Sequence, residues 1–310
     1  MNITIVGLGT VGISLGLALK AIAPDVTITG HDPDPERAKR AQDLGAIGKR
    51  HWNLPAACEG ADLVLLDLPL SEMEKTLGPL GEVLQEGAVV LDVCPLKGAV
   101  MEMAARLLPP HVSFIGGDLL SPKVCEGIAP SADLVRGAIF FLVPSPRASA
   151  EALERVSDFV EAVGARPHYI EAAEHDSLIA AMVQAPAMCA LALFKVVEEA
   201  AGARERRYAC GPAFAALAQI LSTTAVEGEA LRANRERLVY WLDAILAELG
   251  RVRAALTTDV PGLAGEIERA RQTAQAWLQG PEAEGAPPPQ KGAPDWRQMW
   301  LGNLGRKPKR

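Results

Sequence analysis

The sequence has little that would support a metal centre or a disulfide framework. Its five cysteines, Cys58, Cys94, Cys125, Cys189 and Cys210, are scattered along 310 residues and form no Cys-x-x-Cys pair. The five histidines are also dispersed and lack the His-x-x-x-His spacing of metal ligands on a helix. This pattern predicts a protein without a structural zinc site.

Three further absences exclude broad functional classes. The net charge is −7, so the chain lacks the basic balance of a general nucleic-acid binder. No apolar run is expected to approach the roughly 20 residues of a membrane span. The N-terminus lacks the basic start of a secretory signal peptide. We therefore expect a cytoplasmic protein that binds neither nucleic acid nor membranes.

The most informative feature that is present is a glycine-rich turn. It lies between an apolar run at residues 3–6 and an apolar helical pattern, and its spacing is Gly7-x-Gly9-x-x-Gly12. Gly7 would allow a tight turn, Gly9 would let the backbone approach a pyrophosphate, and Gly12 would let the helix pack against the strand. In this strand–turn–helix context, the spacing predicts a dinucleotide-binding fold.

Asp32 at the end of the second predicted strand bears on the choice of cofactor. A carboxylate there can accept both ribose hydroxyls of NAD and would repel the 2′-phosphate of NADP. Arg37 and Lys39 follow on a predicted helix, so NADP stays open. We expect NAD, with its phosphates at the helix N-terminus formed by Thr10 and Val11.

The chain divides into parts with different patterns. Through residue 171, apolar runs bounded by turns alternate with helical patterns, which predicts an α/β Rossmann domain with a doubly wound parallel sheet. The predicted strands lie at 3–6, 26–30, 62–66, 88–92, 112–115, 138–143 and 166–170. From 172 to 279 the strand patterns stop, which predicts an all-α C-terminal domain for dimerisation.

Two stretches of the second half suggest contacts between molecules. The helix expected at 178–197 is apolar on nearly every side, so we place it at the centre of a homodimer. Residues 280–294 are rich in Pro, Gly and Ala and predict a linker. The tail at 295–310, with Trp296 and Trp300, is expected to dock on the partner subunit, on the cleft or on another protein.

Five segments with matching spacing carry a family resemblance. They are the glycine-rich turn, the strand and turn at 61–69, Asp-Val-Cys-Pro-Leu-Lys at 92–97, Glu174-His175-Asp176 with the run at 183–187, and Asn234-Arg235. Together they resemble the prephenate/arogenate dehydrogenase family over about residues 1–250. The resemblance implies hydride transfer to NAD, an intertwined dimer, and cofactor contacts at Leu68, Pro69 and Cys94.

The chain departs from the family at the residues that carry the chemistry. The resemblance implies that Asp118 stands where the family has a catalytic histidine in a Gly-Gly-His-Pro-Met motif. Gln184 takes the place of a second histidine, and Gln219 that of an arginine that pairs with a substrate carboxylate. Lys97 matches a family lysine. These four residues are the candidate catalytic set, and Lys97, Lys123 and Arg136 are the cations that could supply charge.

The replacements remove cations, which a dicarboxylate such as prephenate needs, because a buried carboxylate without a partner costs several kcal/mol. We therefore expect an altered substrate, and an acidic, amide-lined pocket would suit a neutral compound or an amine. Asp118 is expected to follow a strand end, near Asp67, where two carboxylates would raise each other's pKa and allow general-base chemistry. A turn-capping role is the alternative. His175 and Cys94 are interpreted as structural.

Three hypotheses of function follow. The first is an NAD-dependent oxidoreductase of the prephenate dehydrogenase type with the original or a changed substrate. The second is a catalytically inactive dinucleotide-binding dimer that acts as a sensor or scaffold. The third is reduction of an imine or ketone, with Asp118 as the proton donor.

Overall fold

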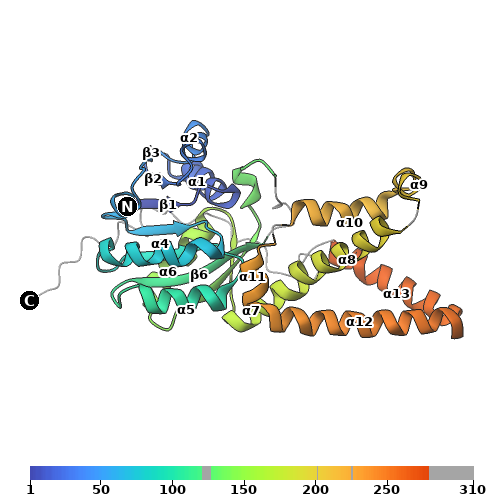
Figure 1. Cartoon of the computed structure of the whole chain (residues 1–310). Coiled ribbons are helices and arrows are strands. Elements are labelled where there is room, and N and C mark those ends of the chain that lie inside the picture. The colour runs from blue at the N-terminus through green and yellow to red at the C-terminus, as the bar shows by residue number, and fades with distance from the viewer. Residues whose placement is uncertain (121–126, 201, 225, 279–310) are drawn as a thin grey trace, which may run out of the picture.

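The structure is a computed structural model that describes residues 1–120, 127–200, 202–224 and 226–278. A sheet flanked by helices forms the first half, and helices alone form the second (Figure 1). The predicted linker and tail, with Trp296 and Trp300, lie outside the described residues, as does Lys123.

The eight strands are arranged in the order β3-β2-β1-β4-β5-β6-β7-β8. Their bounds are β1 Asn2–Val6, β2 Thr27–His31, β3 Lys49–Arg50, β4 Leu63–Leu66, β5 Val89–Asp92, β6 Ser113–Leu120, β7 Ile139–Pro144 and β8 Arg166–Tyr169. All neighbours pair in parallel except β6 and β7, which are antiparallel. The predicted Rossmann architecture is confirmed. Only β3 was not predicted, because its two exposed residues carry no apolar pattern.

Helices cover both faces of the sheet, and core residues alternate along its central strands accordingly. On β1, Ile3 and Ile5 belong to one hydrophobic cluster and Val6 to the other. The first face is covered by α1 (Thr10–Ile22), α2 (Pro35–Asp43), η1 (Ala132–Leu134) and α6 (Ala150–Ala162), and the second by α3 (Leu54–Cys58), α4 (Leu70–Val83) and α5 (Lys97–Leu107). Burial on both faces explains the continuous apolar runs in the sequence.

β6 continues to Leu120, beyond the predicted end at residue 115. Its later part pairs only with β7, so it projects past the end of β5. A glycine pair hid this continuation, because glycine weakens a strand pattern. A Cβ on Gly117 would lie 2.6 Å from the Asp92 carbonyl oxygen, so close packing and not a turn requires glycine there. Asp118 therefore lies within β6, which corrects the expectation that it follows a strand end.

The second half is helical, as predicted. Its elements are α7 Ala172–Ile179, η2 Ala180–Gln184, α8 Ala185–Glu199, α9 Ala203–Tyr208, α10 Pro212–Thr223, α11 Gly228–Ala233, α12 Arg235–Thr258 and α13 Val260–Leu278. Figure 1 shows α8, α10, α12 and α13 projecting from one side of the sheet-bearing half, with α9 at the far end. Two residues from this half, Ile179 and Ala230, join the hydrophobic core beside α4 and α5.

The expectation that no apolar run approaches the length of a membrane span is wrong. Ala172–Glu199 is one helical run of 28 residues, and its most apolar window has a mean hydropathy of 1.9 and is 33% buried. The run contains a π-helical turn, η2, just before Pro186. Proline lacks an N–H and its ring crowds the carbonyl four residues earlier, which disfavours regular α-helix at this point. Along the run, Met182 and Val196 are exposed, so one chain leaves part of this apolar surface uncovered.

Candidate functional site

The glycine-rich turn has the backbone that a nucleotide-binding loop needs. Gly7 has φ +83°, and its N–H donates to the His31 carbonyl at 2.9 Å. A Cβ on Gly7 would lie 2.0 Å from the Asp67 carbonyl oxygen, so only glycine fits. The first N–H groups of a helix have no intrahelical partner, and at α1 these belong to Thr10, Val11 and Gly12.

Asp67 occupies the space beside the other two glycines. Its Oδ2 accepts a hydrogen bond from the Gly12 N–H at 2.6 Å. A Cβ on Gly9 would lie 2.8 Å from the same oxygen, and one on Gly12 would lie 2.8 Å from the Gly7 carbonyl oxygen. In this structure the Asp67 carboxylate therefore occupies the space beside Gly9, where the sequence pattern predicts the close approach of a pyrophosphate.

Asp32, the residue after β2, binds the backbone of the glycine-rich turn. Its Oδ2 accepts from the Leu8 N–H at 2.9 Å and its Oδ1 from the Asp34 N–H at 2.8 Å. Arg37 lies 3.9 Å away through its Nη1. A carboxylate oxygen can accept two hydrogen bonds, so Asp32 retains capacity for ribose hydroxyls. The glycine turn and Asp32 fit a dinucleotide, whereas Asp67 places a carboxylate on the Gly12 N–H, a donor that a phosphate would use.

The remaining predicted cofactor residues, Leu68, Pro69 and Cys94, follow the neighbouring strands β4 and β5. Leu68 and Pro69 connect β4 to α4, and the Leu68 side chain lies close over Gly7. Cys94 is 1% exposed, and burial raises the pKa of its thiol to about 12. The Cys94 side chain is thus a neutral packing group, in line with its structural interpretation, and its N–H donates to Asp92.

Lys97 is fully buried and ion-paired with Asp92, whose carboxylate is also fully buried. Its Nζ also donates to the Gly117 carbonyl oxygen at 2.6 Å. The Asp92 carboxylate further accepts from the N–H groups of Cys94 at 2.9 Å and Gly117 at 3.2 Å. The charge of Lys97 is therefore neutralised inside the protein, which corrects the expectation that it could serve a substrate carboxylate.

Asp118 faces His175, which the sequence analysis interpreted as structural. The His175 Nε2 lies 3.2 Å from Asp118 Oδ2, and its Nδ1 lies 3.4 Å from Asp176 Oδ1. The imidazole is fully buried, whereas the Asp118 side chain is 9% exposed. Phe141, opposite Asp118 on β7, packs edge-on against the imidazole ring. Asp118 is thus paired with an imidazole and not, as expected, with Asp67.

Asp176 joins this pair to the start of α5. Its Oδ1 accepts from the Lys97 N–H at 2.7 Å and its Oδ2 from the Gly98 N–H at 2.9 Å. These bonds cap a helix whose own N-cap residue provides no side-chain bond.

Gln184 is held by Asn234, the residue between α11 and α12, rather than from the sheet. The Asn234 side chain donates to the Asp176 carbonyl oxygen at 2.8 Å and to Gln184 Oε1 at 2.9 Å. Gln184 is 4% exposed, and Asn234 Oδ1 is buried without a partner among the described residues. The structure therefore brings Gln184 into the cluster of Lys97 and Asp118, through Asn234 and Asp176.

Gln219 is the predicted residue that the structure does not bring to this cluster. It is exposed on α10, and no side-chain hydrogen bond of the described residues joins it to Asp118 or Gln184. Arg136, the other cation expected to supply charge, is also exposed, and its guanidinium pairs with Asp133 at 2.9 Å.

The pKa of His175 makes the stability of this cluster depend on pH. Burial lowers this pKa, but hydrogen bonds with Asp118 and Asp176 outweigh burial and raise it above its usual value. Histidine has a pKa of about 6.5 when unfolded, so the stabilisation is fully present below that pH and is lost as pH rises through the raised value.

We therefore expect the destabilisation caused by His175→Gln to be larger at pH 5.5 than at pH 8.5. Urea unfolding of both proteins at the two pH values measures the difference, and comparing the two chains removes the contribution of other titrating groups. A difference that is the same at both pH values would contradict the assignment.

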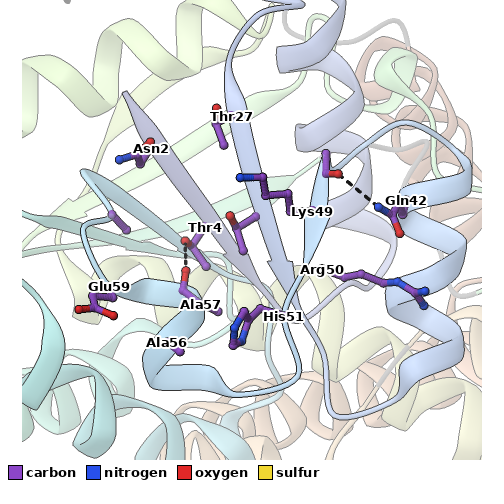
Figure 2. A pocket seen from close by; sticks show the side chains of 13 residues that line it. Asn2, Thr4, Thr27, Gln42, Lys49, Arg50, His51, Ala56, Ala57 and Glu59 are labelled. Carbon is purple, nitrogen blue, oxygen red and sulfur yellow. Dashed lines mark hydrogen bonds between the residues drawn. The ribbon is translucent and has the colours of Figure 1, made fainter.

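A separate hollow lies on one face of β1, β2 and β3, next to α3 (Figure 2). Its volume is about 640 Å³, and polar side chains such as Thr4, Thr27, Lys49 and His51 line it. None of the predicted catalytic or cofactor residues is among its lining residues. It is therefore distinct from the site built around the glycine turn and Asp118.

Comparisons with known proteins agree with one another. A family model for the nucleotide-binding domain of prephenate dehydrogenase matches residues 15–169. The chain is 26% identical over 260 residues to a cyclohexadienyl dehydrogenase from Zymomonas mobilis, which covers 83% of this chain and 89% of that protein.

Two solved structures share the fold. One is a prephenate dehydrogenase from A. aeolicus in complex with hydroxyphenyl propionate and NAD+, with a TM-score of 0.79, 20% identity, and coverage of 89% of this chain and 98% of the other. The second is an arogenate dehydrogenase from Synechocystis, with a TM-score of 0.73, 20% identity, and coverage of 89% and 100%.

Proposed function

The chain belongs to the prephenate dehydrogenase family, and on this premise we propose that it is an NAD-dependent oxidoreductase acting on a ring alcohol of the prephenate and arogenate type. The observation that carries the proposal is the pairing of Asp118 with His175 at 3.2 Å. A carboxylate and an imidazole within hydrogen-bond distance of each other can together take up a proton from a substrate hydroxyl. The family position that lacks its histidine here thus still has an acid–base pair.

The proposed reaction gives separate tasks to three residues of the cluster. Oxidation of the ring alcohol removes a hydride from carbon and a proton from oxygen, and the ring carboxylate then leaves as CO₂ to give an aromatic ring. NAD supplies the hydride acceptor when bound. Asp118, the carboxylate that faces His175 from β6, takes up the hydroxyl proton. His175 and Asp176 are positioning residues that hold the Asp118 carboxylate in place.

The charges of the cluster favour a substrate with an amino group. Gln184 and Asp118 stand where the family resemblance implies histidines, and the charge of Lys97 is used by Asp92. A second substrate carboxylate would be buried here without a cation, which costs several kcal/mol. Arogenate carries an ammonium beside its side-chain carboxylate, whereas prephenate does not. We therefore propose an arogenate-type substrate in place of prephenate.

Formation of NADH with each substrate tests this function directly. We expect a kcat above about 1 per second with arogenate, a kcat/KM at least about tenfold lower with prephenate, and a preference for NAD over NADP because of Asp32. Equal turnover of both substrates would contradict the substrate assignment. Tight NAD binding without turnover of either would instead indicate the inactive dinucleotide-binding dimer.

We also propose that the protein is a cytoplasmic homodimer, whose two chains associate through their helical halves. Large apolar side chains on four of its helices are exposed in the single chain, and they include Met182, Leu193, Val196, Tyr240, Leu246 and Ile267. Exposed apolar patches of this kind are typical of contacts between subunits. Light scattering on the assay sample is expected to give about twice the chain mass of 32.8 kDa.

A further inference from the structure

The carboxylate of Asp67 lies where an anion would bind the glycine turn. Its Oδ2 is 2.6 Å from the Gly12 N–H, at the N-terminus of α1. Gly9, the N-cap residue of that helix, has no side chain to cap it. The free N–H groups at a helix N-terminus bind phosphates and carboxylates in the same way. Asp67 thus uses a donor that a pyrophosphate would otherwise use.

The surroundings of Asp67 do not offset its charge. Asp32, at the end of β2, is the acidic group that faces it, and Arg37, on α2, is the basic one. The Arg37 side chain is 61% exposed and lies 3.4 Å from Asp34 and 3.9 Å from Asp32. Its charge is therefore shared with two other carboxylates and largely screened by solvent.

The protonation of Asp67 is sensitive to pH near neutrality. Burial raises its pKa to about 6, and the charge of Asp32 adds to this effect against hydrogen bonds from Gly12 and Gly9. The two negative charges of a pyrophosphate, placed beside this group, would favour its neutral form further.

We propose that Asp67 is a built-in competitor for the pyrophosphate of the dinucleotide, so that NAD binds when this carboxylate is protonated. The inference rests on the proposed function, because it takes the glycine turn to be the NAD site. It makes Asp67 a determinant of cofactor affinity that sets the pH range of binding. Protonated Asp67 could also donate a hydrogen bond to a phosphate oxygen.

The dependence on pH follows from the fraction of protein that is competent to bind. The apparent Kd is the intrinsic Kd divided by that fraction, so it rises roughly tenfold per pH unit once Asp67 is ionised. Between pH 5.5 and pH 8, the Kd of the wild-type chain for NAD+ is expected to rise roughly fifty- to a hundredfold.

Calorimetric titration of the full chain with NAD+ at pH 5.5, 7 and 8 tests the proposal. Asp67→Asn keeps the shape and the hydrogen bond from Gly12 but carries no charge. We expect this variant to bind NAD+ at least about tenfold more tightly than wild type at pH 8, with little dependence on pH. Asp62→Asn, which removes a carboxylate just before the start of β4, is the matched control and should follow wild type.

The outcomes separate this inference from the proposed function. If Asp67→Asn and wild type bind NAD+ equally at all three pH values, or if the variant binds more weakly, the inference is wrong, while turnover of arogenate would still support the function. If no chain binds NAD+ or NADP+ at any pH, both proposals fail. Thermal unfolding of each variant confirms that it is folded under the titration conditions.

Discussion

Asp118→Asn is expected to lower kcat by about 10²- to 10⁴-fold, the usual contribution of a general base. Asparagine has nearly the shape of aspartate and can still accept a hydrogen bond from His175 Nε2, which lies 3.2 Å from the carboxylate. It cannot, however, take up the proton that leaves the substrate hydroxyl. Steady-state NADH formation at saturating substrate measures the loss, and calorimetry is expected to show unchanged NAD affinity.

Asp158→Asn is the matched control, because Asp158 lies on α6 and has no part in the cluster. Its kcat should equal that of wild type. If Asp118→Asn retains wild-type kcat, the proton acceptor lies elsewhere and the role assigned to Asp118 is wrong. Equal unfolding midpoints for Asp118→Asn and wild type would show that the loss of rate does not come from unfolding.

Lys97→Met is expected to lower the free energy of unfolding by about 3–5 kcal/mol, the usual cost of breaking a buried ion pair by removing one partner. Both side chains of the Lys97–Asp92 pair are fully buried. Methionine fills most of the space of the lysine stem but leaves the Asp92 carboxylate without a cation. It also leaves the Gly117 carbonyl oxygen without the donor that now lies 2.6 Å away. Urea unfolding measures the change.

Two further variants define the cause of that loss. Lys75→Met removes an exposed lysine that pairs with Glu72 on α4, and such pairs contribute about 0–1 kcal/mol. The double variant Asp92→Asn, Lys97→Met should recover part of the lost stability, because no buried charge remains. If the double variant is as unstable as the sum of the two single ones, loss of packing rather than an unpaired charge explains the effect.

The elements of the sheet-bearing half could be predicted because each strand or helix leaves a pattern within its own stretch of sequence. Apolar runs of strand length, separated by turns and helical patterns, indicate parallel strands covered on both faces. The exceptions have particular causes. Two exposed residues were too few to reveal β3, and a glycine pair concealed the second half of β6. Gly117, the second glycine of that pair, allows the close approach of Asp92, which lies 25 positions earlier in the sequence.

The candidate site could be predicted only in part, because the sequence indicates which residues take part but not which residues they contact. Lys97 was identified, yet its neutralisation by Asp92 depends on how β5, α5 and β6 pack together. Asp118 was identified, but its partner His175 comes from the helical half. The His-Asp pair at the start of a helix was the one available indication, and it did not show which carboxylate the imidazole faces.

The position of Asp67 in the glycine turn could not be predicted for a related reason. Its place at the end of a strand was evident, but the hydrogen bond to Gly12 joins residues 55 positions apart. The spacing of the glycines alone suggested that the space beside Gly9 belongs to a phosphate. A carboxylate from β4 can enter that space only because β1 and β4 are neighbours in the sheet.

The bond between Asp176 and α5 has a consequence for how the protein folds during synthesis. The sheet-bearing half leaves the ribosome first, but the Lys97 and Gly98 N–H groups at the start of α5 remain uncapped until Asp176 emerges. Ile179 and Ala230 complete the core beneath α4 and α5 later still. A fragment that stops at the last strand would therefore lack the carboxylate that caps α5 and two residues of the core beside α4 and α5.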